Sequence, residues 1–143
     1  MPILLKRVYE KPSPADGARV LVDRLWPRGV SKRAAALDAW LKDVAPSDAL
    51  RRWFHARPRH WQMFRKRYLV ELAQPSAEQA LEELYEMAAR RRQLTLVFSS
   101  RNQEHNNAAV LKQLLEGMRK PPSSSGGAAA ANLRGRARAS RRN

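Results

Sequence analysis

Three short apolar runs predict the β-strands of this chain. Residues 3–8 and 19–25 are strand-like, and the second run contains the β-favouring segment 20–22. Residues 94–98 form a nearly continuous apolar run of strand length. A run that is apolar on both faces is typical of a strand buried inside a parallel sheet. The pattern therefore predicts at least one fully covered strand.

Between the second and third runs, the apolar spacing becomes that of amphipathic helices. Ser31 is a suitable N-cap for a helix over 32–41, and Ser47 for a second helix that continues to Trp53. Pro58 is suited to the first position of a third helix. One stripe of that helix would be apolar, with the residues Trp61, Phe64, Tyr68 and Leu72.

Two further helices are predicted on either side of the third apolar run. Ser76 and Gln79 have the spacing of a capping box at the start of a fourth helix. Its apolar face would consist of Leu81, Leu84, Tyr85 and Ala88. The last helix would present Ala108, Leu111, Leu115 and Met118 in register.

This order of elements predicts an α/β fold. Two strands are followed by a helix-rich middle, a third strand and a final helix, so a small, mostly parallel sheet covered by helices is expected. The strand order stays open. At 143 residues, the chain has room for one compact domain.

The charge of the chain divides into two parts. Lys and Arg number 28 against 13 Asp and Glu, a formal net charge of +15. Residues 119–143 hold seven of the basic residues and no acidic one, and they follow a Pro-, Ser- and Gly-rich linker. We interpret 119–143 as a disordered basic tail and 1–118 as the folded domain, which carries +8. An excess of this size favours anionic partners.

Composition also restricts the chemistry. The chain has no Cys, so disulfides, thiolate nucleophiles and Cys-ligated metals are excluded. His55 and His60 are five residues apart and interrupted by Pro58, a poor spacing for a metal site, and we predict neither a metal nor a cofactor. No apolar stretch is long enough to span a bilayer, so no membrane contact and a cytoplasmic location are expected.

Two loops that follow predicted strands are the candidates for chemistry. The first, 23–29, holds Asp23, Arg24 and Arg28, with Pro27 and Gly29 specifying a turn. The second, 99–107, opens the last helix. If both strands are parallel in one sheet, both loops lie at the edge where open α/β folds bind ligands. The residues predicted to bind an anion are Arg24, Arg28, Ser99, Ser100, Arg101 and Asn106.

Catalytic and purely structural interpretations of these loops both stay open. Asp23 is a candidate base or a residue that orients an arginine, and His105 is a candidate acid–base group. Alternatively, Asp23 pairs with Arg24, Asn102 caps the last helix, and His105 only bonds a neighbour. The tryptophans are interpreted as core or pocket lining rather than as platforms for nucleic-acid bases: Trp26, Trp40, Trp53 and Trp61.

A series of motifs resembles the YeaO-like proteins, a family known as domain of unknown function 488 (DUF488). The most specific motif is the string VDRLWPRG at 22–29, and Glu104-His105-Asn106-Asn107 is another. Further matches run in order between them, including Trp40-Leu41-Lys42-Asp43 and Trp53-Phe54-His55. The resemblance covers most of 3–118 and leaves out the tail.

The resemblance implies a small single-domain α/β protein and no particular reaction. The family usually has Lys-Asp-Glu before its Glu-His-Asn, whereas Arg101, Asn102 and Gln103 stand here. This difference removes a carboxylate from the candidate pocket and favours anion binding over acid–base chemistry. The function expected first is therefore binding of a small phosphate-bearing or nucleotide-like anion at the strand-end loops, and whether the protein is an enzyme stays open. The alternatives are nucleic-acid binding through the basic surface and tail, and an adaptor role.

Overall fold

The computed structural model describes residues 3–91 and 93–118, so the predicted tail at 119–143 lies outside the described residues. Its strands are β1 (Ile3–Arg7), β2 (Ala18–Leu21), β3 (Ala39–Trp40) and β4 (Leu94–Phe98). Its α-helices are α1 (Lys32–Ala35), α2 (Asp48–Ala56), α3 (Trp61–Leu72), α4 (Pro75–Arg90) and α5 (Asn107–Gly117). Two short 3-10 turns, η1 (Pro14–Asp16) and η2 (Lys42–Val44), complete the order.

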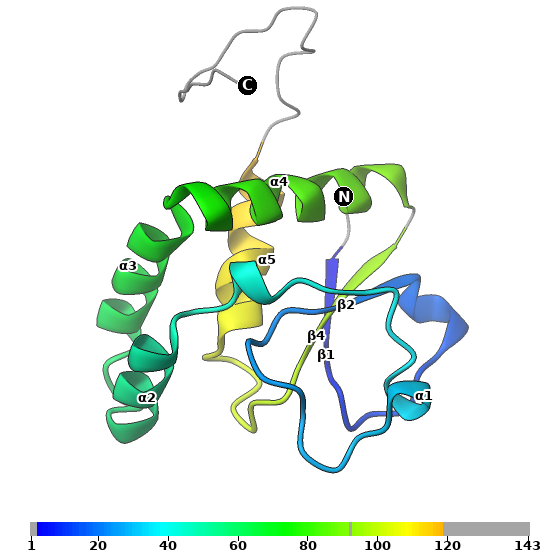
Figure 1. The fold of residues 1–143 in the computed structure, drawn as a ribbon, viewed down its shortest axis with the longest axis horizontal. Helices are drawn as coiled ribbons and strands as arrows, with labels where there is room; N and C mark the ends of the chain where they lie inside the picture. Colours follow the sequence, from blue (N-terminus) through cyan, green and yellow to red (C-terminus); the bar gives the residue numbers. More distant parts are fainter. Residues whose placement is uncertain (1–2, 92, 119–143) are drawn as a thin grey trace, which may run out of the picture.

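The strands form one parallel sheet in the order β1-β4-β2-β3 (Figure 1). β4 pairs with β1 from Ile3↔Leu94 to Arg7↔Phe98 and with β2 from Ala18↔Leu94 to Leu21↔Val97. Every residue of β4 is buried, as expected for the central strand of a covered parallel sheet. The predicted α/β class and the predicted strand at 94–98 are confirmed.

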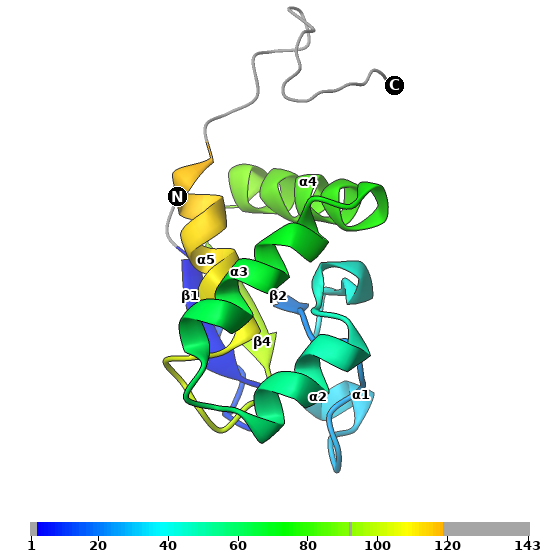
Figure 2. The same ribbon diagram turned by 90° about the vertical axis from the view of Figure 1, so that its left-hand side faces the viewer.

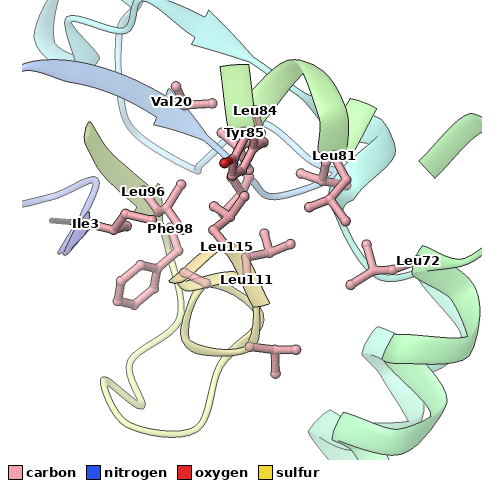
Figure 3. Close-up of a cluster of buried hydrophobic side chains, with 14 of the residues drawn as sticks. Ile3, Val20, Leu72, Leu81, Leu84, Tyr85, Leu96, Phe98, Leu111 and Leu115 are labelled. Atoms are coloured by element: carbon pink, nitrogen blue, oxygen red, sulfur yellow. The ribbon is translucent and has the colours of Figure 1, made fainter. Parts of the chain in front are cut away.

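The main core lies between one face of the sheet and helices α2 to α5. Leu96 and Phe98 of β4 meet Leu111 and Leu115 of α5, and Leu84 of α4 closes the layer (Figure 3). The apolar stripes predicted for the third, fourth and last helices all face this core. Burying such side chains contributes roughly 1.5–3 kcal/mol each, so these stripes hold the helices on the sheet.

The opposite face of the sheet carries a smaller core. Leu21 and Val97 pack there against Ala35 of α1, which lies on the far side of the sheet from α3 (Figure 1). Trp26 and Trp40 cover this cluster, with ring centroids 5.3 Å apart in an edge-to-face arrangement. These two tryptophans therefore act as core residues, as their interpretation from the sequence expects.

The helix predicted over 32–41 is wrong beyond its first turn. Ser31 caps α1 as expected, but Ala36 adopts a left-handed conformation (φ 49°) that ends the helix. The Asp38 N–H then donates to the Arg19 carbonyl oxygen, and Asp38 Oδ2 accepts the Arg19 N–H. Pairing with β2 thus converts the rest of this segment into strand β3.

Two predicted helix starts also differ from the structure. α3 begins at Trp61, and Pro58 lies in the preceding turn. α4 begins with Pro75 at its first position and Gln74 as an N-cap without a side-chain bond, so the capping box at Ser76 is not formed. A proline at the first helical position sacrifices no intrahelical hydrogen bond, which explains why Pro75 fixes the start.

Candidate functional site

The two loops predicted to carry chemistry lie side by side. Because β2 and β4 are parallel neighbours, their carboxyl ends reach the same edge of the sheet. There Asp23 Oδ2 accepts hydrogen bonds from the N–H and the hydroxyl of Ser99, at 2.9 and 2.7 Å. Asp23 therefore ties the first loop directly to the second.

The other carboxylate oxygen of Asp23 faces the last helix. Asn107 Nδ2 donates to Asp23 Oδ1 at 3.2 Å and to the Val22 carbonyl oxygen at 2.8 Å. Both carboxylate oxygens thus have protein donors, and neither bond comes from Arg24. The alternative of an Asp23–Arg24 ion pair is not realised in the part of the chain that the structure describes.

The three arginines predicted to bind an anion differ in their contacts and exposure. Arg24 donates from Nε to the Pro46 carbonyl oxygen and from Nη2 to that of Ala45, both at 3.1 Å. Arg28 is exposed, and its backbone carbonyl accepts the Tyr9 hydroxyl at 3.1 Å. Arg101 is also exposed. Arg28 and Arg101 are therefore the two of the three whose guanidinium groups face solvent.

The loop before α5 is organised by its own side chains. Asn102 Oδ1 accepts the N–H groups of Glu104 and His105 at 3.0 and 2.8 Å, and the hydroxyl of Ser100 accepts the Asn102 N–H at 3.2 Å. Asn106, 3% exposed, is the N-cap of α5 and accepts the N–H of Ala109. The helix cap is thus Asn106, and Asn102 shapes the turn before it.

Arg7 also belongs to this edge, although the sequence offered no reason to select it. Its Nε donates to the Ser100 carbonyl oxygen and its Nη2 to that of Ser99, both at 2.9 Å. The two loop residues are 92 and 93 positions away along the chain. Only the pairing of β1 with β4 brings Arg7 close to this loop. In the sequence, the contact is signalled by nothing more than an arginine near the end of a predicted strand.

A cluster of three charged side chains, Lys6, Asp16 and Arg19, lies next to the sheet. Asp16 pairs with Arg19 at 2.7 Å and with Lys6 at 3.0 Å. Burial acts to raise the pKa of the Asp16 carboxyl, but hydrogen bonds from the Ser13 N–H, Lys6 and Arg19 outweigh it and hold that pKa below its usual value. The carboxylate is therefore charged at neutral pH and structural in role.

A buried tyrosine lies behind the loops. Burial raises the pKa of the Tyr68 hydroxyl well above its usual value, and the negative charges of Asp23 and Glu71 add to the rise. The hydroxyl donates to the Val44 carbonyl oxygen, so Tyr68 stays protonated and joins α3 to the segment before α2. Glu71 in turn accepts the N–H and the hydroxyl of Ser47.

His105 lies beside an open hollow of about 680 Å³ between α3, α5 and β1, elements that lie together in Figure 2. Its ring stacks on that of Trp61, with centroids 4.6 Å apart and planes 11° from parallel. Arg65 of α3 and Lys112 of α5 supply positive charge at the wall. The remaining lining residues are Leu5, Gln62, Glu104, Ala109 and Gln113. The wall of the hollow therefore combines a stacked pair of aromatic rings with two cations and the carboxylate of Glu104.

A second group of positive charges lies on the α2–α3 hairpin. We call residues 49–70 the basic hairpin, because this stretch has seven Lys or Arg and no Asp or Glu. Arg67 and Arg57 lie over the Trp53 ring, with their guanidinium carbons 4.4 and 5.5 Å from its centroid. No site was predicted at this surface from the sequence, although the triplet Arg65-Lys66-Arg67 and a run without acidic residues are visible there.

The described residues provide neither a metal-binding cluster nor a helix that could cross a membrane. Within 3–91 and 93–118, no group of three or more His, Asp or Glu side chains is placed to hold a metal ion. His60, one of the two histidines considered, lies edge-on to Trp53 with centroids 6.0 Å apart. Over the same ranges, none of the helices has the length and apolar character needed to cross a membrane.

Comparison with known proteins identifies relatives of this chain. It is 46% identical over 100 residues to a protein of Escherichia coli K12 named "Uncharacterized protein YeaO", a match that covers 70% of this chain and 84% of the relative. It is 44% identical over 88 residues to "Uncharacterized protein Rv3073c" of Mycobacterium tuberculosis H37Rv, covering 62% and 72%. No solved structure matches the chain.

The family model that matches is described as the "Inactive DUF488-N3 subclade", and it matches residues 2–130. The matched stretch includes both strand-end loops, the basic hairpin and the hollow, and it ends beyond Met118, where the sequence analysis places the end of the domain. The YeaO-like resemblance is thereby confirmed, and the chain belongs to the DUF488 family, in its inactive N3 subclade.

Proposed function

We propose that this chain is a binding protein for a small phosphate-bearing, nucleotide-like ligand, taken up in the hollow beside the 99–106 loop. The observation that carries the proposal is the parallel stack of His105 on Trp61, with Arg65 and Lys112 at the same wall. A planar ring would stack on His105, and the phosphate would meet the two cations. Gln62 adds an amide donor and acceptor for the polar edge of the ring, and Gln113 accepts the Arg65 Nε–H at 3.3 Å and keeps its amide N–H groups for a ligand.

The proposed site is centred on the hollow and still includes residues of the two strand-end loops. Arg28, near the end of the first loop, and Arg101, near the start of the second, are exposed and stay candidate anion contacts, as do Ser99 and Ser100. Arg24 and Asn106 would contribute indirectly, because their side chains already bond Pro46, Ala45 and the start of α5. Their role in this proposal is to hold the loops in place.

Binding is favoured over turnover by the state of the candidate catalytic groups. Three hydrogen bonds from Ser99 and Asn107 occupy most of the acceptor positions of the Asp23 carboxylate, which favours a role in joining the loops over a role as a base. His105 is stacked flat on an indole ring, with no carboxylate bonded to it among the described residues. The description of the subclade as inactive agrees with this choice.

A thermal-shift screen of the full chain against nucleotides and phosphorylated metabolites tests the proposal. A ligand that raises the melting temperature is then titrated against the double variant Arg65→Gln, Lys112→Gln. We expect its affinity to fall roughly a hundredfold, since two charge-assisted contacts are lost. The matched control is Lys32→Gln, Arg33→Gln, two exposed cations of α1 on the other face of the sheet.

The same titration separates the hollow from the strand-end loops. An Arg28→Gln, Arg101→Gln variant that loses binding while the hollow variant keeps it would return the site to the loops. If the hollow, loop and control variants all bind like the wild type, the proposal is wrong.

Nucleic-acid binding through the basic surface and the tail is a second candidate function. The observation that favours it is the distribution of charge within 1–118. The basic hairpin holds seven of the 21 basic residues and none of the 13 acidic ones, so it carries +7 of the domain's +8. A charge concentrated on one hairpin is suited to a phosphate backbone.

A further inference from the structure

The basic hairpin keeps most of its charge available. Asp48, just before it, pairs with Arg51 and Arg52 at 2.5 Å each. No other ion pair among the described residues involves the hairpin. The cations left for a ligand are four exposed ones, Arg57, Arg59, Lys66 and Arg67, together with the half-buried Arg65.

Trp53 orders part of this charge before any ligand arrives. The guanidinium groups of Arg57 and Arg67 both lie over its ring, although one comes from the end of α2 and the other from the middle of α3. An arginine stacked on an indole loses less conformational freedom when it meets a phosphate. Trp53 thus holds together two guanidinium groups that come from the two arms of the hairpin.

The basic hairpin and the hollow share helix α3. This helix, drawn beside α5 and β1 in Figure 2, carries Lys66 and Arg67 of the hairpin and three residues that line the hollow, Trp61, Gln62 and Arg65. His105 is exposed, one face of its ring lies on Trp61, and the residue lines the hollow. A row of cations next to an aromatic platform is the arrangement that holds a single strand, whose bases are free to stack on protein rings.

We infer that this surface binds single-stranded nucleic acid, with phosphates on Arg57, Arg59, Lys66 and Arg67 and an unstacked base against His105. A duplex fits less well, because its bases are already stacked and paired and do not reach the hollow. The inference rests on the second candidate function. It places the contact on the folded hairpin rather than on the tail, and it names the class of nucleic acid.

Fluorescence anisotropy with the full chain tests this inference. The probes are a labelled oligothymidine and an oligouridine of about twelve nucleotides and a duplex of similar length, titrated between about 50 and 200 mM salt. The hairpin variant carries Arg57→Gln, Arg59→Gln, Lys66→Gln and Arg67→Gln. The matched tail variant removes the same charge through Arg134→Gln, Arg136→Gln, Arg138→Gln and Arg141→Gln.

We expect the hairpin variant to lower the salt slope for the single strand by about 3, because each phosphate contact contributes about 0.7. At about 0.1 M salt, that change corresponds to a loss of several hundredfold in affinity. The tail variant should lose less affinity than the hairpin variant.

His105→Ala should weaken single-strand binding roughly fivefold without changing the salt slope, and it should leave duplex binding unaltered. The hairpin substitutions lie on exposed side chains, so circular dichroism and melting temperature should match the wild type.

Three results of these titrations would contradict the inference, each in a different way. No binding of any probe at the lowest salt overturns nucleic-acid binding itself, and the inference with it. Binding that the tail variant loses and the hairpin variant keeps leaves the function standing and overturns the hairpin as its site. Equal affinity for the duplex together with an unaffected His105→Ala variant overturns the preference for single strands.

Discussion

The cations beside the sheet and those of the basic hairpin differ in what they bond. Arg7, Arg19 and Arg24 each donate to backbone carbonyls, and Lys6 and Arg19 share the Asp16 carboxylate. On the hairpin, Arg57 and Arg67 lie on an aromatic ring and face solvent. The first group stabilises the fold, whereas the second leaves its charge exposed to solvent. Net charge alone does not distinguish these two uses.

Two Asp–Arg pairs illustrate the contrast at the same spacing in the sequence. Asp16 and Arg19, three residues apart, pair at 2.7 Å and are each 3% exposed. Asp48 and Arg51, also three apart, pair at 2.5 Å on the surface of α2. A buried pair is costly to break, because the remaining charge is left without water, and an exposed pair is not. The two regions should therefore respond very differently to substitution.

The largest expected effect comes from breaking the buried pair. Arg19→Ala should lower the free energy of unfolding by about 3–5 kcal/mol, because the buried Asp16 carboxylate and the Ala35 carbonyl lose their donors. Arg51→Ala, its match on the hairpin, should leave stability unchanged within error. Urea denaturation of both variants gives the comparison. Equal losses would mean that burial does not separate the two regions.

A smaller effect is expected within the VDRLWPRG motif. Arg24→Ala should cost about 2 kcal/mol, since the Ala45 and Pro46 carbonyls lose a charged donor. Arg28→Ala should be close to neutral, because only the Arg28 backbone carbonyl is bonded, to Tyr9. Thermal unfolding of the two variants distinguishes a structural arginine from an available one. A destabilising Arg28→Ala would show that its side chain also serves the fold.

The smallest effect is expected in the acid range. Since the pKa of Asp16 is lower in the folded chain than its usual 3.8, the carboxylate stabilises the fold above that value. This stability should be lost as pH falls below about 3.8 and through the folded pKa. The Asp16→Asn variant should show a flatter dependence of unfolding free energy on pH there. Asp48→Asn is the control, because the pKa of Asp48 is also lowered, chiefly by its bond from Arg51, but at the surface. A wild-type slope retained in Asp16→Asn would contradict the assignment.

Much of the fold was predictable because its signals are local. The run at 94–98 matches β4, Ser47 caps α2, and the stripes of α3, α4 and α5 are buried as their spacing indicates. The segment after Ser31 was not predictable from the same rules. Its residues 39–40 are strand because they pair with β2, and no local propensity encodes that partner.

The candidate site was predictable only in outline. That two parallel strands bring 23–29 and 99–107 to one edge follows from topology, and the Asp23–Ser99 bonds agree with it. Which arginine is available does not follow from spacing. Arg24 and Arg28 are four residues apart in one motif, yet the first is bonded to the segment before α2 and the second is exposed.

The sequence by itself determined the class of the fold, the family and the excess of positive charge. Apolar periodicity, a specific motif and an excess of basic residues are all properties of composition and order. Only the tertiary structure decided which charges are used internally, and which remain on the hairpin and around the hollow. The physical reason is that the cost and use of a charge depend on its burial and its partners, and contacts between distant segments set both.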